Sequence, residues 1–88
     1  LEQNYPNPFN PSTTISFSLA EPSQVKLSII NVLGQEVRTI LDALMVAGNH
    51  SVEWDGRDGR GIESASGVYL YRLTAADGTQ TRKMVLVR

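Results

Sequence analysis

The sequence contains no cysteine among its 88 residues. Disulfide bonds, cysteine-ligated zinc, iron–sulfur clusters and a thiol nucleophile are therefore excluded. Charge of one sign is also lacking, because 8 basic and 9 acidic side chains leave a formal charge of −1. This balance argues against a nucleic-acid-binding protein, which needs an excess of basic residues to neutralise phosphates. No apolar run approaches the roughly 20 residues of a membrane-spanning helix, and no signal peptide opens the chain.

The chain has few groups for catalysis, since His50 is its only histidine. It lies beside Ser51 in a segment of alternating polarity, and no spacing of serine, histidine and aspartate in the sequence indicates a catalytic relay. We therefore expect no enzymatic activity and no cofactor, with His50 half-exposed on the surface of a sheet. The start at Leu1, without a methionine, predicts a fragment or a processed domain.

The first twelve residues are expected to form an extended, non-helical arm, because three prolines fall within them. Tyr5 and Phe9 are the side chains that would attach this arm to the rest of the domain. Downstream, apolar and polar residues alternate with the period of half-buried strands. This alternation covers residues 14–19, 25–29, 50–54 and 68–75, and residues 79–88 form a last strand.

The segment from Val37 to Met45 is ambiguous. Its apolar residues fit the spacing of an amphipathic helix that stops at Gly48. The preceding residues 31–35 instead indicate a hairpin turn in which Gly34 supplies a positive φ, which favours a strand over residues 37–41. Asp77-Gly78 is a second hairpin signal.

This pattern predicts an all-β fold. Six strand candidates, a seventh if the arm pairs, and no βαβ unit favour an immunoglobulin-like antiparallel β-sandwich of about seven strands, without a disulfide. We expect one domain over residues 1–88, with the arm at 1–12. The predicted core takes one apolar side chain from every second position of the strands: Ile15, Phe17, Leu27, Ile29, Val52, Trp54, Tyr69, Tyr71 and Leu73.

Three groups of side chains are candidates for a binding site. Asp55, Asp58 and Glu63 lie in a glycine-rich loop without the spacing of a calcium-binding loop, so a role in turns is favoured and no metal is predicted. The aromatic residues of the predicted core fit packing better than a sugar-stacking platform. The cations of residues 82–88 flank an apolar strand, which fits either a protected edge strand or a strand offered for recognition by strand addition.

A resemblance covers the whole chain. It rests on the order of NYPNPFNP (residues 4–11), TISF (14–17), NVLG (31–34), Gly48, VEWDG (52–56), SGVYLY (66–71) and RKMVL (82–86). This succession resembles the type A C-terminal sorting domain of the type IX secretion system, found on cargo proteins of Bacteroidota. The WDG and SGVY motifs are also similar to the immunoglobulin-like domain of the flagellar hook-capping protein.

The resemblance implies a seven-stranded immunoglobulin-like sandwich and therefore a strand over residues 37–41. It implies a non-catalytic C-terminal signal that directs an N-terminal cargo, absent from this chain, from the periplasm through the outer membrane. The partners would be the type IX translocon and a sortase-like surface protease that cuts upstream of Leu1, leaving the cargo at the cell surface or secreted.

The residues that the resemblance assigns to recognition lie in two motifs. These are Gly67, Val68 and Tyr69, with the glycine at a tight entry and the tyrosine inward, and Lys83, Met84, Val85 and Arg88 in the terminal strand. Asn7, Pro8 and Phe9 belong to the opening arm, with a structural role. The alternative is a structural immunoglobulin-like module of an extracellular or flagellar protein; a carbohydrate-binding module ranks lower.

Overall fold

The computed structural model describes residues 1–88 and contains strands, turns and loops only. No helix is present, and so none that could cross a membrane. The strands are β1 (Thr13–Leu19), β2 (Ser23–Asn31), β3 (Glu36–Met45), β4 (Gly48–Trp54), β5 (Gly67–Ala75) and β6 (Gly78–Leu86).

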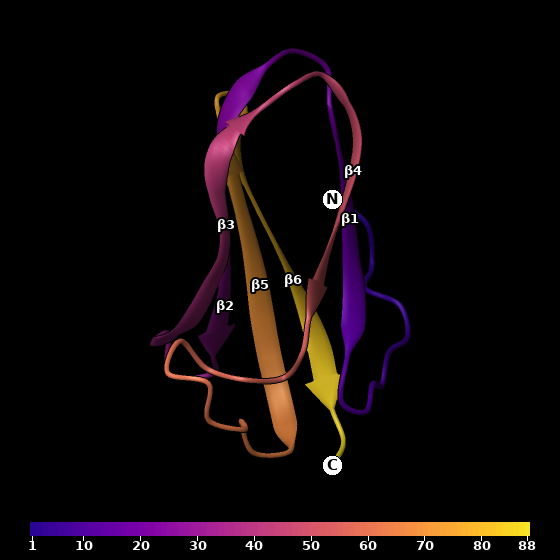
Figure 1. The fold of residues 1–88 in the computed structure, drawn as a ribbon, viewed down its shortest axis with the longest axis vertical. Helices are drawn as coiled ribbons and strands as arrows, with labels where there is room; N and C mark the ends of the chain where they lie inside the picture. Colours follow the sequence, from indigo (N-terminus) through magenta and orange to yellow (C-terminus); the bar gives the residue numbers. More distant parts are fainter.

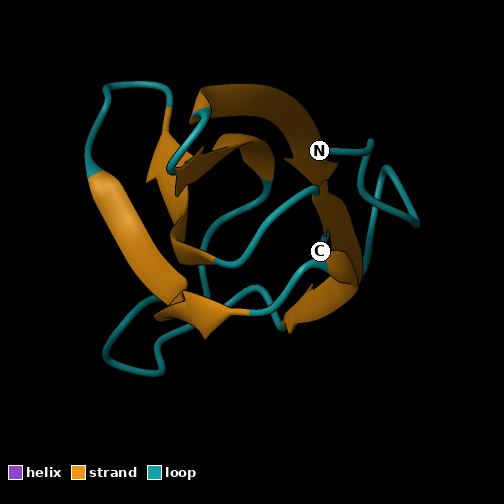
Figure 2. Cartoon of the chain, turned by 90° about the horizontal axis from the view of Figure 1, so that it is seen from above, coloured by secondary structure: helices purple, strands orange, loops and turns teal.

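The strands form two antiparallel sheets (Figure 1). β1 pairs with β4, and the other four strands form a sheet in the order β3-β2-β5-β6. Seen along the long axis, the strands surround a common centre (Figure 2). The prediction of an all-β, immunoglobulin-like sandwich is therefore confirmed. The molecule has six strands instead of seven. The arm pairs with β1 and β6 through isolated bridges and does not form a continuous seventh strand.

Strand alternation sends one set of side chains into the space between the sheets. Eight of the nine predicted core residues are buried there; Val52 is half-buried at the margin of the core, on a strand whose sheet has only two members. The prediction left out five further core residues, namely Phe9, Leu19, Val25, Met84 and Leu86. The core therefore includes side chains from the arm and from the end of the chain.

The ambiguous segment is a strand. Residues 36–45 form β3, which pairs with β2 through a turn in which Gly34 has a φ of 83°. Pairing with β2 overrides the local helical spacing because it satisfies the backbone while Val37, Ile40, Leu41 and Met45 still pack against the core. The second hairpin is also present, although its two-residue loop is Ala76–Asp77 and Gly78 already pairs with Ala75.

The arm (residues 1–12) joins the two sheets. Its first part pairs with β1, where Tyr5 and Thr14 exchange backbone hydrogen bonds of 3.0 and 2.9 Å. Its second part pairs with β6 at Phe9. The side chain of Phe9 is buried, whereas Tyr5 is 81% exposed, so only Phe9 acts as the predicted apolar anchor. The arm bends between these two contacts and closes the side of the sandwich where β1 and β6 are edge strands.

Candidate functional site

The two recognition motifs predicted from the sequence are neighbours in one sheet. In the register of β5 and β6, Gly67 lies opposite Leu86, Val68 opposite Val85, and Tyr69 opposite Met84. Gly67 has a φ of 153°, a value that favours glycine, and it starts β5 where the loop enters the sheet. The structure thus brings together residues that are more than a dozen positions apart in the chain.

The arm motif lies on the other side of β6. The backbone N–H of Phe9 donates to Val85 O at 3.0 Å, and Val87 N–H donates to Phe9 O at 2.9 Å. The side-chain Oδ1 of Asn7 accepts a hydrogen bond from Val85 N–H at 3.0 Å. Gln3 Nε2 donates to Lys83 O at 2.8 Å. Together with Pro8, which connects Asn7 to Phe9, the arm occupies the outer edge of β6 from residue 83 to residue 87.

This occupation favours the interpretation of the terminal strand as a protected edge strand. β6 is an edge strand of the four-stranded sheet. A partner that adds a strand needs unpaired backbone groups on such an edge. The edge-facing backbone groups from Lys83 O to Val87 N–H are already bonded to the arm. This end of β6 is therefore a covered edge.

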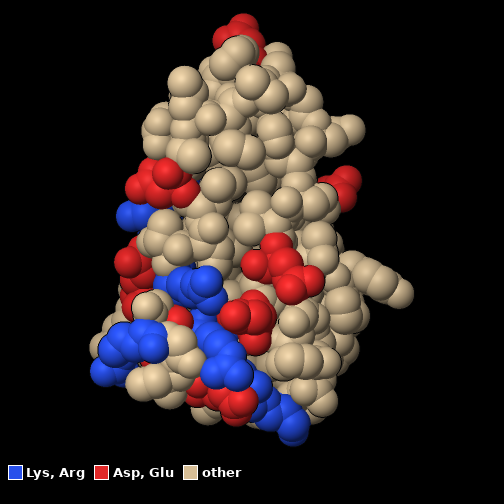
Figure 3. Space-filling model, viewed as in Figure 1, with Lys and Arg blue, Asp and Glu red and all other residues tan.

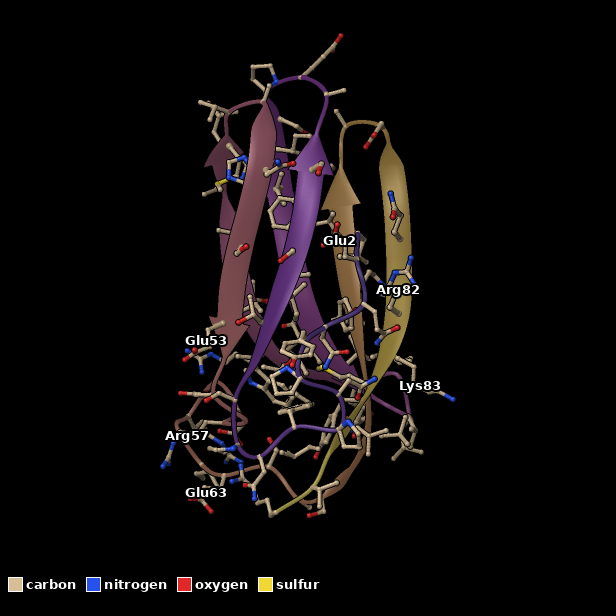
Figure 4. The ribbon with its side chains drawn as sticks, turned by 90° about the vertical axis from the view of Figure 1, so that its right-hand side faces the viewer. Glu2, Glu53, Arg57, Glu63, Arg82 and Lys83 are labelled. Atoms are coloured by element: carbon tan, nitrogen blue, oxygen red, sulfur yellow. The ribbon has the colours of Figure 1, made fainter.

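Burial separates the predicted recognition residues into two sets. Tyr69 is 9% exposed and Met84 is fully buried, so both are core residues, and Tyr69 packs inward as predicted. Lys83 is exposed, Val68 is 39% exposed and Val85 is half-buried. Figure 4 shows Lys83 projecting from β6 away from the sandwich. Gly67 is also exposed, so Gly67 and this second set are available to a partner.

Arg88 has a structural role that the sequence did not indicate. Its Nη2 donates to Gly56 O at 2.6 Å and its Nε to Ser64 O at 2.5 Å. Its backbone N–H donates to Ser66 Oγ at 2.8 Å, and Nη1 lies 3.7 Å from the carboxylate of Glu63. The side chain is 24% exposed. Arg88 therefore holds the acidic loop (residues 55–66), and its charge is engaged within the domain.

The three carboxylates of the acidic loop have separate partners. Asp55 accepts a hydrogen bond from Arg38 at 2.9 Å, and Glu63 pairs with arginines. Asp58 Oδ1 accepts hydrogen bonds from the backbone N–H groups of Ile62 and Arg60, which hold the pKa of this carboxyl below its ordinary value. No group of three or more potential metal ligands is present. Figure 3 shows basic and acidic side chains intermingled on the lower part of the molecule, where this loop runs.

The aromatic residues form the centre of the core. The ring of Trp54 lies 5.7 Å from that of Phe9 and 5.4 Å from that of Tyr69, and its Nε1 donates to Arg57 O at 2.9 Å. Trp54 and Tyr71 are fully buried. These rings cannot serve as a sugar-stacking platform in this fold. His50, half-buried on β4, stacks on Phe17 with ring centroids 5.4 Å apart.

Tyr71 holds the arm through its hydroxyl group, a role that its sequence position does not indicate. Its hydroxyl donates to Glu2 O at 2.7 Å and accepts a hydrogen bond from Asn4 N–H at 2.9 Å. Burial raises the pKa of Tyr71 above its ordinary value. A tyrosine at an inward position of an alternating strand indicates a core residue, but nothing in the local sequence connects it to residues almost seventy positions away.

Comparisons with known proteins agree with this architecture. The FlgD Ig-like domain model matches residues 5–79. Among solved structures, dimeric latent PorU from Porphyromonas gingivalis aligns with 97% of this chain at 22% identity and a TM-score of 0.76. PorZ, a surface component of the type IX secretion system of the same organism, aligns with 98% at 22% identity and a TM-score of 0.64.

FlgD from P. aeruginosa aligns with 84% of the chain at 26% identity and a TM-score of 0.66. The chain spans 9% of the length of PorU, 11% of PorZ and 58% of FlgD. At 22% identity, the likeness to PorU and PorZ is one of fold. No curated protein matches the sequence. Because the family model covers most of the chain, from the arm to the start of β6, this chain belongs to the FlgD Ig-like domain family.

Proposed function

We propose that this domain is a non-catalytic sorting module that directs an attached cargo through the outer membrane by the type IX secretion system. The single observation that carries this proposal is the convergence of the arm, the start of β5 and the end of β6. The motifs that resemble a sorting domain are paired with one another at one end of the sandwich. A folded surface at the end of the chain is therefore available as an address.

Two comparisons support the proposal. The family model stops at residue 79, so residues 80–88, which contain the terminal motif, lie outside it. The fold shared with PorZ, which is itself a surface component of the type IX system, covers 98% of the chain. By contrast, the alignment with FlgD covers 84%.

The burial of the motif residues supports recognition of the folded domain. Phe9, Tyr69 and Met84 are interior, so they would act by shaping the sandwich. Gly67, Val68, Lys83 and Val85 are exposed or half-buried, so a translocon could touch them. The domain would thus be recognised in its folded form. The cargo would precede Leu1, and a surface protease would cut in the segment before it.

The test is export of a reporter. The domain is fused to the C-terminus of a periplasmic reporter in a bacterium that has the type IX system, and the cell-surface and medium fractions are assayed. We expect export of the intact fusion, reduced export of Lys83→Ala, and unchanged export of Gln80→Ala, an exposed control on the same strand. Periplasmic retention of the intact fusion, with the domain folded, would refute the sorting function.

A second candidate function is favoured by the family itself. The chain belongs to a family named for the Ig-like domain of FlgD, and FlgD from P. aeruginosa shares its fold. In this case the domain is a structural or assembly module of an extracellular or flagellar protein. It would then support the position or assembly of its neighbours, and loss of Lys83 would leave the location of a fused reporter unchanged.

A further inference from the structure

The outward face of the four-stranded sheet changes character along β5 and β6. Tyr69, Tyr71 and Leu73 point into the core, so the residues between them point outward. The register then places outward pairs side by side. Thr74 lies opposite Thr79 at one end, whereas Val68 lies opposite Val85 at the other end. One end of this face is polar and the other is apolar.

The apolar end extends over three strands. Ile30 of β2 pairs with Leu70 of β5, which pairs with Lys83 of β6. Ile30 is 3% exposed, so it is not itself available to a partner. We define the outer patch as the five exposed or half-buried residues of this face: Val68, Leu70, Arg72, Lys83 and Val85. Apolar side chains gathered on an exposed sheet face are a common feature of interaction surfaces.

The charges of the outer patch are unpaired. Five of the eight Lys and Arg residues form ion pairs with carboxylates. The three that do not are Arg72, Arg82 and Lys83, all on β5 and β6. Neither of these strands contains an acidic residue. The domain as a whole has a formal charge of −1, so this cationic region is local.

Arg82 belongs to the opposite face of β6. Its Nε donates to Leu1 O at 2.8 Å, so it contacts the arm. Arg72 and Lys83 instead flank Leu70 on the outward face: Lys83 is its cross-strand partner, and Arg72 follows two residues later on the same strand. The outer patch therefore presents an apolar centre with two exposed cations beside it.

We propose that the outer patch is the docking surface of the domain for a protein partner that presents carboxylates around an apolar contact. This inference rests on the proposed sorting function, because the partner would belong to the secretion machinery. Charge complementarity selects such a partner, since like charges across an interface are unfavourable. The same argument disfavours a second copy, because a two-fold contact would bring Arg72 and Lys83 against their own counterparts. The covered edge of β6 leaves this face as the accessible side of the terminal strand.

Added negative charge on the two faces of the sheet tests the proposal in the reporter fusion. The variant Arg72→Glu/Lys83→Glu reverses the outer patch. Gln80→Glu is the control on the opposite face, since Gln80 is exposed and pairs with the inward-pointing Leu73. We expect about a tenfold loss of export for the double variant, because each like-charge contact in an interface is costly. The control retains export. Both purified domains should melt close to the parent, since exposed charge changes alter stability by less than about 0.5 kcal/mol.

A neutral variant, Arg72→Gln/Lys83→Gln, keeps the side-chain length and should give an intermediate loss. If the parent fusion is exported and the reversed variant is exported equally well, the outer patch is not the docking surface, while the sorting function stands. If the parent fusion is retained, the sorting function itself fails.

The other possible occupants are tested on the purified domain. Co-sedimentation with vesicles of phosphatidylcholine and phosphatidylglycerol that is lost in the double variant would assign the patch to an anionic lipid surface and overturn the proposal. A concentration-dependent dimer in analytical ultracentrifugation that the double variant abolishes would assign it to a second copy and overturn the proposal as well.

Discussion

At the scale of single residues, Arg88 connects the end of the chain to a loop more than twenty residues away. Its guanidinium donates hydrogen bonds to the carbonyl oxygens of Gly56 and Ser64. Hydrogen bonds from a charged donor contribute more than neutral ones, and arginine suits such a position because its donors lie in a fixed plane. A basic residue at the end of the chain is thus part of the fold.

Replacement of Arg88 should lower stability. We expect Arg88→Ala to reduce the free energy of unfolding by about 1.5–3 kcal/mol, because two charge-assisted hydrogen bonds of a largely buried side chain are lost. Arg88→Lys keeps the charge but not the planar donors, so it should recover only a small part of the lost free energy of unfolding. Urea unfolding followed by Trp54 fluorescence measures both variants. Full recovery by lysine would show that charge alone matters.

Gly56 is required for the same contact. It has a φ of 77°, and a Cβ there would lie 2.9 Å from Pro11 O and 3.0 Å from Arg88 Nη2. Gly61 has a φ of 81° and open space around it. We expect Gly61→Ala to cost about 1–2 kcal/mol from backbone strain alone, and Gly56→Ala to cost clearly more. Thermal unfolding of the two variants gives the difference; equal losses would mean that the close approach to Pro11 is unimportant.

At the scale of elements, the arm behaves as a strand that changes sheets. It bonds to β1 through Tyr5 and to β6 through Phe9, and Tyr71 bonds it from inside. Edge strands that remain open invite pairing with other chains. The arm covers part of both edges on its side of the sandwich, which on β6 is the end from residue 83 onward. Its pairing thus protects a domain whose small core has no disulfide.

Removing the hydroxyl of Tyr71 should loosen the arm. Tyr71→Phe leaves the N–H of Asn4 and the carbonyl of Glu2 without this partner, which we expect to cost about 1–3 kcal/mol. Burial raises the pKa of Tyr71, so the folded state holds this proton more tightly than the unfolded chain. The contribution of the protonated Tyr71 hydroxyl to the free energy of unfolding is therefore complete below about pH 10. It decreases as the pH rises from there through the folded-state pKa.

Denaturant unfolding between about pH 8 and pH 11 tests this dependence, because it spans the ordinary pKa of tyrosine. The parent should lose more stability over this range than Tyr71→Phe. Tyr5→Phe is the control for the loss of a tyrosine hydroxyl, since the side chain of Tyr5 is exposed. Equal slopes for parent and Tyr71→Phe would contradict the role assigned to burial.

Local patterns predicted the elements better than the contacts between them. Alternation gave β1, β2, β5 and most of the core, because each strand shows a solvent face and an apolar face in its own sequence. β3 stayed ambiguous since pairing with β2, and not its own spacing, decides its conformation. The contacts of Arg88, Tyr71 and the arm join residues far apart in the chain, so no local signal announces them. For the same reason the sequence could not show that the edge of β6 is covered.

At the scale of the whole molecule, the two ends of the chain complete the sandwich. Phe9 from the arm and Met84 and Leu86 from β6 are part of one core cluster with Trp54 and Tyr69. A domain of this size buries a modest fraction of its surface, so few side chains can be lost without unfolding. The residues assigned to the proposed sorting function overlap with those that stabilise the fold, so experiments on that function must separate the two.

Deletion of residues 83–88 should unfold the domain. It removes Met84 and Leu86, which are fully buried, and each such loss typically costs about 2–5 kcal/mol. It also removes the backbone partners of Phe9 and the contacts of Arg88 with the acidic loop. The sum is comparable to the whole stability of a small domain, about 5–15 kcal/mol.

Near-ultraviolet circular dichroism should collapse, and the emission of Trp54 should shift to longer wavelength. Lys83→Ala, which removes one exposed side chain of the same segment, should keep both signals. Periplasmic retention of a deleted fusion would then report unfolding, and only variants that stay folded can report recognition. A deletion that melts cooperatively near the parent would show instead that the chain's end is dispensable for the core.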